Sequence, residues 1–547
     1  MKHNFSYLLN KWRQKKKKSA AVNNIPSDQT TLEKKLQDTV HSVRSSLGES
    51  SDFVVRNFKV GNNQTIKAAL LYMDGLADKS FIQNFIMETL MVDTELEEIS
   101  GKDISNDSGQ STSVSVSGKQ GDFFKQFKDR IVANSEVSEI NSYESLFQYL
   151  LAGDSILLLD GYVKGFAIGS KGYESRGVQE PSSQTVVRGP KDGFSEVLRT
   201  NTSLIRRRIK DPNLWVENKV IGKKTNTDVA ICYINGVVNE KVVQEVKQRL
   251  DKVDIDAILE SGYIEETIQD ETFTPFPTIY NTERPDTICA GLLEGRVAIM
   301  VDGTPFVLLV PALFVHFFQS SEDYYQRSDV GTLVRLLRYL CFFLALLTPA
   351  SYIALTTFHQ EMIPTQLLVS LAAQREGVPF PAYVEALLME ITFEILREAG
   401  TRMPRAVGNA ISIVGALVLG QAAVEAGIVS SAMVIVVSLT AISSFVSPTF
   451  NMAISVRILR FGFMTLAAMF GLVGIILGLI VMVLHLTSLR SFGIPYLAPM
   501  GPFIPSDQKD ALVRMPFWNL RNRPKLINQT DLEREDTPSP KPPSTKQ

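Results

Sequence analysis

The sequence predicts an α+β N-terminal cytoplasmic domain, made of two subdomains, followed by a multi-pass α-helical membrane domain. Two observations carry this prediction. Apolar residues are unevenly distributed, because residues 1 to about 290 look soluble whereas residues 331–490 contain long runs without charge. The N-terminal part also mixes short β-branched runs with helical periodicity, a mixture typical of α+β folds.

The N-terminal region begins with a segment that lacks a sustained apolar period. Residues 1–50 are polar and charged, with a basic run at Lys15 to Lys18, and predict a disordered basic arm or a loosely helical one. Residues 51–148 form the first cytoplasmic subdomain, with strand-like and helical stretches and a loop rich in Ser, Gly and Asp at 101–121. No apolar core follows the basic run, so no signal peptide is expected.

Residues 149–290 are expected to form the second cytoplasmic subdomain. Asp160-Gly161 between short apolar runs predicts a β-hairpin, and residues 240–253 have the apolar spacing of a helix. A basic run at Arg206, Arg207 and Arg208 is a candidate patch for phosphate or anionic lipid. A solvated face or a salt-bridged contact between subunits explains the same run, and both interpretations stay open.

Residues 291–330 predict a junction, made of a hairpin and an interfacial helix. Two β-branched runs flank the turn Asp302-Gly303-Thr304-Pro305, and a turn inside an apolar run excludes a membrane span. Beyond Pro311 the chain is rich in aromatic residues, which suit the headgroup boundary. Asp302, Gly303, Pro305 and Pro311 are therefore candidate coupling or gating residues, with a simple structural lid as the alternative.

Residues 331–490 are predicted to form a transmembrane helical bundle. Four runs carry no charge over about 20 residues or more, which is enough to cross a bilayer. These runs are residues 339–359, 406–424, 426–456 and 461–489. Basic residues before the first run and after the last, including Arg335 and Arg338, place both ends in the cytoplasm by the positive-inside rule. The number of spans is then even, and residues 491–547 form a C-terminal loop and cytoplasmic tail.

Between these runs, residues 381–400 have helical periodicity and carry acidic residues. Glu390, Glu394 and Glu398 recur every four residues along one stripe of the helix, and Glu385 lies off it. Carboxylates at membrane depth normally face an aqueous path, so all four are candidate pore residues for cations. An amphipathic helix at the interface, with its acids in water, explains the pattern equally well. Whether this segment spans the membrane is left open.

The sequence contains no pattern typical of catalysis or of a metal or cofactor site. Walker, HExxH and GxSxG motifs are absent, the 5 histidines are scattered, and the 3 cysteines are far apart. We therefore expect no enzyme activity, no metal and no cofactor. The formal net charge of −2 argues against binding nucleic acid. A secondary transporter remains an alternative, although no internal repeat of broken helices is seen.

Several uncommon strings resemble the A subunit of the spore germinant receptors, the GerA family of endospore-forming bacteria. The strings are "VRGPKDGF" (187–194), "TERPD" (282–286), "DGTPF" (302–306) and "FGIPYLAPMGPF" (492–503). The resemblance covers roughly residues 50 to 515. It implies a multi-pass protein of the spore inner membrane, with the N-terminal domain on the cytoplasmic side.

The resemblance also implies partners and an activity. A subunits of this family are expected to work with a transporter-like B subunit and a lipoprotein C subunit in sensing nutrients. They are thought to oligomerise as pentamers into a nutrient-gated cation channel. A paralogous membrane protein encoded with the dipicolinic acid transport genes shares these motifs, so a channel acting alongside dipicolinic acid release is the alternative.

Overall fold

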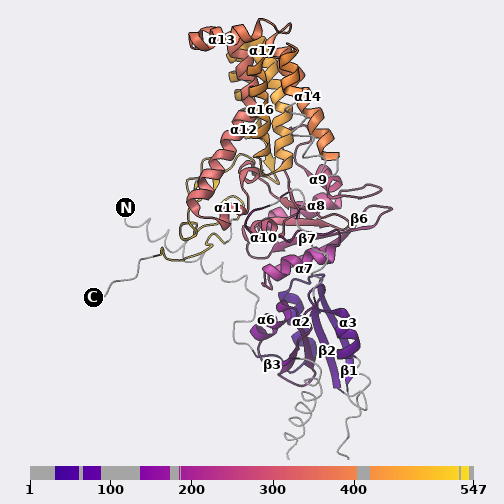
Figure 1. Cartoon of the computed structure of the whole chain (residues 1–547). Coiled ribbons are helices and arrows are strands. Elements are labelled where there is room, and N and C mark those ends of the chain that lie inside the picture. The colour runs from indigo at the N-terminus through magenta and orange to yellow at the C-terminus, as the bar shows by residue number, and fades with distance from the viewer. Residues whose placement is uncertain are drawn as a thin grey trace, which may run out of the picture.

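A computed structural model describes residues 31–60, 66–87, 136–172, 181, 184, 186–402, 419–528 and 531–540 of the chain. Three parts follow one another along one direction (Figure 1): a first α/β domain, a second α/β domain and a helical part. The predicted loop at 101–121, most of the predicted basic arm and most of the run at 406–424 lie outside the described residues.

The first domain is built on a five-stranded antiparallel sheet of order β1-β2-β4-β5-β3. Its elements are α2 (Leu36–Ser46), β1 (Phe53–Val60), β2 (Ile66–Met73), α3 (Lys79–Phe81), η1 (Ile82–Met87), β3 (Val137–Ile140), α6 (Tyr143–Ala152), β4 (Ser155–Leu159) and β5 (Gly165–Ile168). Helices α2 and α6 bury leucine, valine and phenylalanine side chains against one face of this sheet.

The second domain has a five-stranded antiparallel sheet of order β6-β7-β9-β10-β8. Its elements are α7 (Leu198–Arg208), β6 (Leu214–Ile221), β7 (Thr227–Ile234), α8 (Glu240–Asp251), α9 (Ser261–Ile268), β8 (Tyr280–Thr282), α10 (Pro285–Leu293), β9 (Val297–Val301) and β10 (Val307–Val310). The valines and Leu250 of α8 pack on one face of the sheet. The other face belongs to the core cluster that continues into the helical part.

The two domains repeat one topology. In each, an 11-residue helix precedes a hairpin of two eight-residue strands, and a short strand, a helix and a second hairpin complete the sheet. The turn of the second hairpin is Asp-Gly both times. Asp160 Oδ1 accepts a hydrogen bond from Leu36 N, and Asp302 Oδ1 accepts one from Leu198 N, each at 3.0 Å. Each aspartate therefore bonds the first residue of its domain's leading helix.

Three predicted boundaries are wrong. Residues 31–50 are not a disordered arm, because α2 buries Leu36 and Val43 in the first domain. The division at residue 149 separates strands that belong together, since β4 and β5 lie in the first sheet. The predicted junction hairpin is correct as a hairpin, but its strands β9 and β10 are inside the second sheet. Sequence patterns show strands without showing which sheet they join.

The helical part extends from the second domain. Its elements are α12 (Ser328–Thr357), η3 (Gln360–Met362), α13 (Thr365–Arg375), α14 (Ala382–Arg402), α16 (Ser431–Phe445) and α17 (Phe450–Ser488). Helices α12, α14, α16 and α17 run side by side, and α13 lies at the end far from the second domain (Figure 1). Within the described residues, α12 and α17 are long and apolar enough to cross a membrane, and α16 is a shorter apolar helix.

Helix α17 consists of two arms that turn back at Gly471. This residue has φ 60° and ψ −140°, outside the helical region and accessible mainly to glycine. A Cβ atom on Gly474 would lie 2.2 Å from the carbonyl oxygen of Leu466, so the arms pack backbone against backbone. The run predicted as one span at 461–489 is therefore interrupted, because apolar periodicity does not report a tight turn at one glycine.

The C-terminal segment, residues 489–528 and 531–540, returns to the second domain. Its elements are β11 (Arg490–Ser491), β12 (Ile494–Pro495), α18 (Gln508–Ala511) and η4 (Phe517–Asn519). Ser491 Oγ donates to Thr278 O at 2.7 Å, and Tyr496 OH donates to Pro277 O at 2.8 Å. The segment is thus fixed to the strand-bearing part of the second domain.

Candidate functional site

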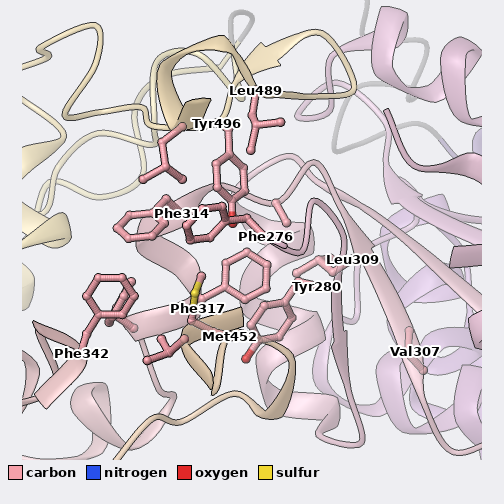
Figure 2. Packing of buried hydrophobic residues seen from close by; sticks show 14 of the residues in the cluster. Phe276, Tyr280, Val307, Leu309, Phe314, Phe317, Phe342, Met452, Leu489 and Tyr496 are labelled. Carbon is pink, nitrogen blue, oxygen red and sulfur yellow. The ribbon is translucent and has the colours of Figure 1, made fainter. Parts of the chain in front are cut away.

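The joint between the second domain and the helical part is an aromatic layer (Figure 2). Phe276 and Tyr280 come from the second domain, and Phe314 and Phe317 from the 3-10 turn η2 (Phe314–Phe318). Phe342 of α12 and Tyr496 of the C-terminal segment meet them. The aromatic residues that follow Pro311 were expected at the headgroup boundary, and this expectation is wrong for η2, because all of its side chains are buried inside the protein.

The residues predicted to gate the junction are separated by the fold. Asp302 and Gly303 form the β9–β10 turn beside α7, where Gly303 N donates to Glu196 O at 2.8 Å. Pro305 follows in the same turn. Pro311 directly follows β10 and begins the connection into the helical part, where Ala312 N donates to Ser491 Oγ at 3.0 Å. Because Asp160-Gly161 repeats this turn in the first domain, we interpret Asp302 and Gly303 as elements of domain structure.

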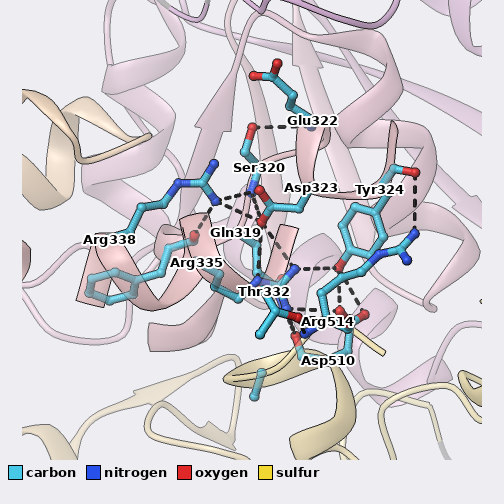
Figure 3. Close-up of polar contacts among 12 residues, drawn as sticks. Gln319, Ser320, Glu322, Asp323, Tyr324, Thr332, Arg335, Arg338, Asp510 and Arg514 are labelled. Atoms are coloured by element: carbon cyan, nitrogen blue, oxygen red, sulfur yellow. Dashed lines mark hydrogen bonds and ion pairs between the residues drawn. The ribbon is translucent and has the colours of Figure 1, made fainter. Parts of the chain in front are cut away.

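A cluster of charged side chains lies at the start of α12, where arginines of that helix meet acidic residues of two other segments (Figure 3). We call Asp323, Tyr324, Arg335, Arg338 and Asp510 the junction cluster. Asp323, in the short helix α11 (Glu322–Tyr325), is 2.8 Å from Arg338 and 3.3 Å from Arg335. Arg335 also pairs with Asp510 of the C-terminal segment at 3.1 Å.

The charges of the junction cluster balance, with two arginines facing two aspartates. Tyr324 OH donates to both carboxylate oxygens of Asp510 at 2.9 Å. Burial, followed by the nearby Asp510, raises the pKa of Tyr324, so its hydroxyl keeps the proton that it donates. Buried charges of this kind persist only when each is paired. The cluster therefore joins three segments: α11, α12 and the C-terminal segment.

Sequence reasoning interpreted Arg335 and Arg338 only as topology signals and missed their partners. Arg335 has no exposed surface, and Arg338 is buried as well. Two arginines three residues apart at the start of an apolar run, with an acidic residue shortly before it, form the only signal for Asp323. Nothing in the sequence indicates Asp510, because it lies 175 residues from Arg335.

The acidic stripe of α14 is largely paired with arginines. Glu390 Oε2 lies 3.0 Å from Arg460 Nη2, and both side chains are fully buried. Glu394 contacts the same Arg460 at 2.9 Å and Arg457 at 3.1 Å. We call Glu390, Glu394, Arg397, Arg457 and Arg460 the helix cluster.

The other two members of the predicted pore set have different environments. Glu385 is buried and accepts a hydrogen bond from the backbone N–H of Ser430 at 2.6 Å, at the start of α16. Glu398 is exposed. The four acids therefore do not line one path within the chain, and Glu398 alone among them is exposed. Helical spacing predicted their common helix but not the arginines of α17 that face it.

The three consecutive arginines of α7 do not form one patch. Arg206 is 1% exposed and pairs with Asp52 of the first domain at 2.8 Å, which makes it a bridge between the two domains. Arg208 contacts Asp192 at 2.5 Å, and Arg207 is exposed. The predicted anion patch is therefore wrong for Arg206, whose charge is already neutralised. Among the described residues, no group of three or more His, Cys, Asp or Glu side chains could hold a metal ion.

Two of the uncommon sequence strings meet at one place. Arg284 pairs with Asp286 at 2.6 Å and donates to the carbonyl oxygen of Pro190 at 3.2 Å. A Cβ atom on Gly189 would lie 2.7 Å from the ring of Tyr325, whose hydroxyl donates to Asp286 at 2.6 Å. The strings at 187–194 and 282–286 therefore form a single structural unit beside α11.

Comparison with known proteins now identifies the family. The model of the Bacillus/Clostridium GerA spore germination proteins matches residues 41–526. The chain belongs to the GerA family. It is 51% identical to spore germination protein KA of Bacillus subtilis (strain 168) over 91% of this chain and 88% of that protein. It is 39% identical to spore germination protein GerLA of Bacillus cereus, over 91% and 97% of the two chains.

Family membership gives the protein a role in spore germination. The chain is also 44% identical to the uncharacterized membrane protein YfkQ of Bacillus subtilis (strain 168), over 89% of this chain and 91% of that one. Among solved structures, it is similar to the N-terminal domain of the A subunit of the Bacillus megaterium spore germinant receptor GerK3. That match has 39% sequence identity, covers 52% of this chain and 98% of the other, and has a TM-score of 0.39.

Proposed function

We propose that this protein is the A subunit of a nutrient receptor in the spore inner membrane and that it triggers germination. The observation that carries the proposal is the extensive similarity to spore germination protein KA over nearly the whole of both chains. In this proposal the helical part crosses the inner membrane in several passes, and the two α/β domains lie on the cytoplasmic side.

The surface of the helical part supports its placement in lipid. Large apolar side chains are exposed along α12, α16 and both arms of α17, where a soluble protein would present polar groups. Examples are Leu340 at 54%, Ile435 at 69%, Ile458 at 59% and Val473 at 66% exposed. Bilayer tails are the environment that matches such a surface.

The receptor works, in this proposal, with a transporter-like B subunit and a lipoprotein C subunit. The A subunit assembles into a homo-oligomer, a pentamer, and conducts cations when nutrient binds. The helix cluster supports a gating role, because it holds α14 to the first arm of α17 through ion pairs buried among apolar helices. Nutrient binding to a partner would favour a second packing of these helices.

Cation flux across liposomes containing the purified receptor tests this proposal. The complex of A, B and C subunits should release a trapped monovalent cation on addition of nutrient, and the complex without the A subunit should not. Because the nutrient is unidentified, a panel of amino acids and sugars is the probe. Nutrient-triggered flux that persists without the A subunit would overturn the channel role.

Two matched substitutions in α14 distinguish two roles for this helix: lining the ion path, and holding the closed packing against α17. Glu398→Gln changes an exposed carboxylate, so it should lower cation conductance or selectivity while the complex still assembles. Glu390→Gln removes the fully buried one of the two carboxylates that pair with Arg460, so it should loosen the closed packing and raise flux without nutrient. The charge-reversed pair Glu390→Arg with Arg460→Glu should restore the closed state. If both single variants behave like the native receptor, α14 has neither role.

A further inference from the structure

A cavity of about 220 Å³ lies where the second domain, the connection into α12 and the C-terminal segment meet. A cavity of this size has room for about seven water molecules, and therefore for a small organic molecule. Its walls come from α10, from η2 and α11, and from Phe517 and Arg534 of the C-terminal segment. Ligand sites are commonly found at such joints between domains.

The polar lining of the cavity contains an unsatisfied cation. Arg296 is 4% exposed, and its Nε atom has no hydrogen-bond partner among the described residues. Its Nη2 atom is already engaged by Glu294 at 2.6 Å. A buried guanidinium N–H without an acceptor is unfavourable, and a bound acceptor would offset this cost.

The charges around the cavity do not balance. Asp286 is compensated by Arg284, and Glu294 by Arg296. Burial lowers the pKa of His316, so this histidine is neutral at pH 7, and the pKa of Tyr325 is raised by burial and by its bond to Asp286. Arg534 lines the cavity without an ion pair among the residues that the structure describes. One positive charge therefore remains uncompensated.

We infer that this cavity binds a small organic anion, a carboxylate with a flat apolar body, between Arg296 and Arg534. Phe517 and Leu309 supply the apolar walls, and Arg534 supplies the charge that complements the carboxylate. The occupant would hold the C-terminal segment against α10. That segment also carries Asp510, the partner of Arg335 in the junction cluster, so occupancy stabilises the contact between the C-terminal segment and α12.

Binding of benzoate to the purified full-length protein in detergent tests the inference. Benzoate should bind and raise the unfolding temperature, whereas benzamide, which has nearly the same shape but no charge, should do neither. Arg534→Gln should weaken benzoate binding about tenfold or more, because it removes a charge-assisted hydrogen bond. Arg490→Gln, which changes an exposed arginine of the same segment outside the cavity, should have no effect.

A second variant fills the cavity without changing charge. Ala290 lines the cavity and is exposed, so Ala290→Phe is compatible with folding and should abolish benzoate binding. Bound benzoate should also slow tryptic cleavage within residues 521–534 of the native protein but not of Ala290→Phe. The inference is overturned if benzoate does not bind at up to about 10 mM, if benzamide binds equally well, or if neither variant changes binding.

Discussion

The two α/β domains share one topology but differ in what covers them. The first domain contacts the rest of the protein at its end, through Arg206, Asp52 and a backbone bond from Ser51 N to Val216 O at 2.9 Å. One face of the sheet of the second domain packs into the core cluster, which continues through the aromatic layer into α12 and α17. The same fold is therefore peripheral in the first domain, whereas in the second domain it packs against the helical part.

This difference lies in the residues outside the repeated elements. Both sheets have the same strand order, and both Asp-Gly turns bond the leading helix in the same way. The second domain, however, is followed at once by η2, α11 and α12, whose aromatic and charged side chains cover it. Attachment to the helices is thus a property of the connection after Pro311 and of the returning C-terminal segment.

The largest expected effect is the loss of Asp323, which anchors the second domain to α12. Asp323→Asn would leave Arg335 and Arg338 short of a carboxylate in a buried site, and breaking such a pairing costs about 3–5 kcal/mol. We expect a large fall in the unfolding temperature of the full-length protein and loss of germination. Asp329→Asn, at an exposed aspartate of α12, is the control and should be neutral. Native-like stability of Asp323→Asn would mean that the aromatic layer alone secures the joint.

Arg206→Met should have the next largest effect, and it should act at the contact between the first and second domains. It leaves Asp52 buried and unpaired at the contact between the domains, at a cost of about 3 kcal/mol. We expect faster amide hydrogen exchange in α7 and around Asp52, with the aromatic layer unchanged. Arg207→Met, at the exposed neighbour, should leave exchange unaltered. If exchange rose equally in the aromatic layer, the two joints would not be independent.

The sequence predicted the elements of each domain better than it predicted their partners. Asp160-Gly161 and Asp302-Gly303 were identified as hairpin turns because Asp-Gly supplies the required backbone conformations locally. Their common role was not predicted, since it depends on helices more than 100 residues away in the chain. Glu390 and Arg460 were missed as a pair for the same reason: spacing along one helix gives no information on the helix that faces it.

Acidification should affect the second domain more than the first, through His316. Burial, and then Arg296, lowers the pKa of His316 below its ordinary value of 6.5, so the folded protein keeps this ring neutral. Below pH 6.5 the unfolded chain binds the proton and gains stability, so the free energy of unfolding falls as pH falls. The slope reaches about 1.4 kcal/mol per pH unit.

Thermal unfolding between pH 7.5 and 5.5 measures this effect on the joint. The His316→Gln variant has no group to titrate at this position and should lose the slope, although the absence of the bond from Leu313 N to His316 Nδ1 lowers its stability at every pH. Hydrogen exchange resolves the two domains, and amides around η2 should open on acidification before those of β1 and β2. Equal opening in both domains would assign the pH dependence to groups other than His316.

The smallest expected loss of stability comes from substitutions in the two repeated Asp-Gly turns, which can be compared directly. Asp160→Ala and Asp302→Ala each remove the acceptor for the first N–H of the leading helix, which costs about 1 kcal/mol. If Asp302 only supports its domain, the two variants should show the same modest loss of stability, and nutrient-triggered flux should stay near the native level in both. If Asp302 also gates the joint, Asp302→Ala should alter flux while Asp160→Ala, with the same structural defect, should not. The repeat thus supplies its own control, because the same contact occurs once in the domain that joins the helical part and once in the domain that does not.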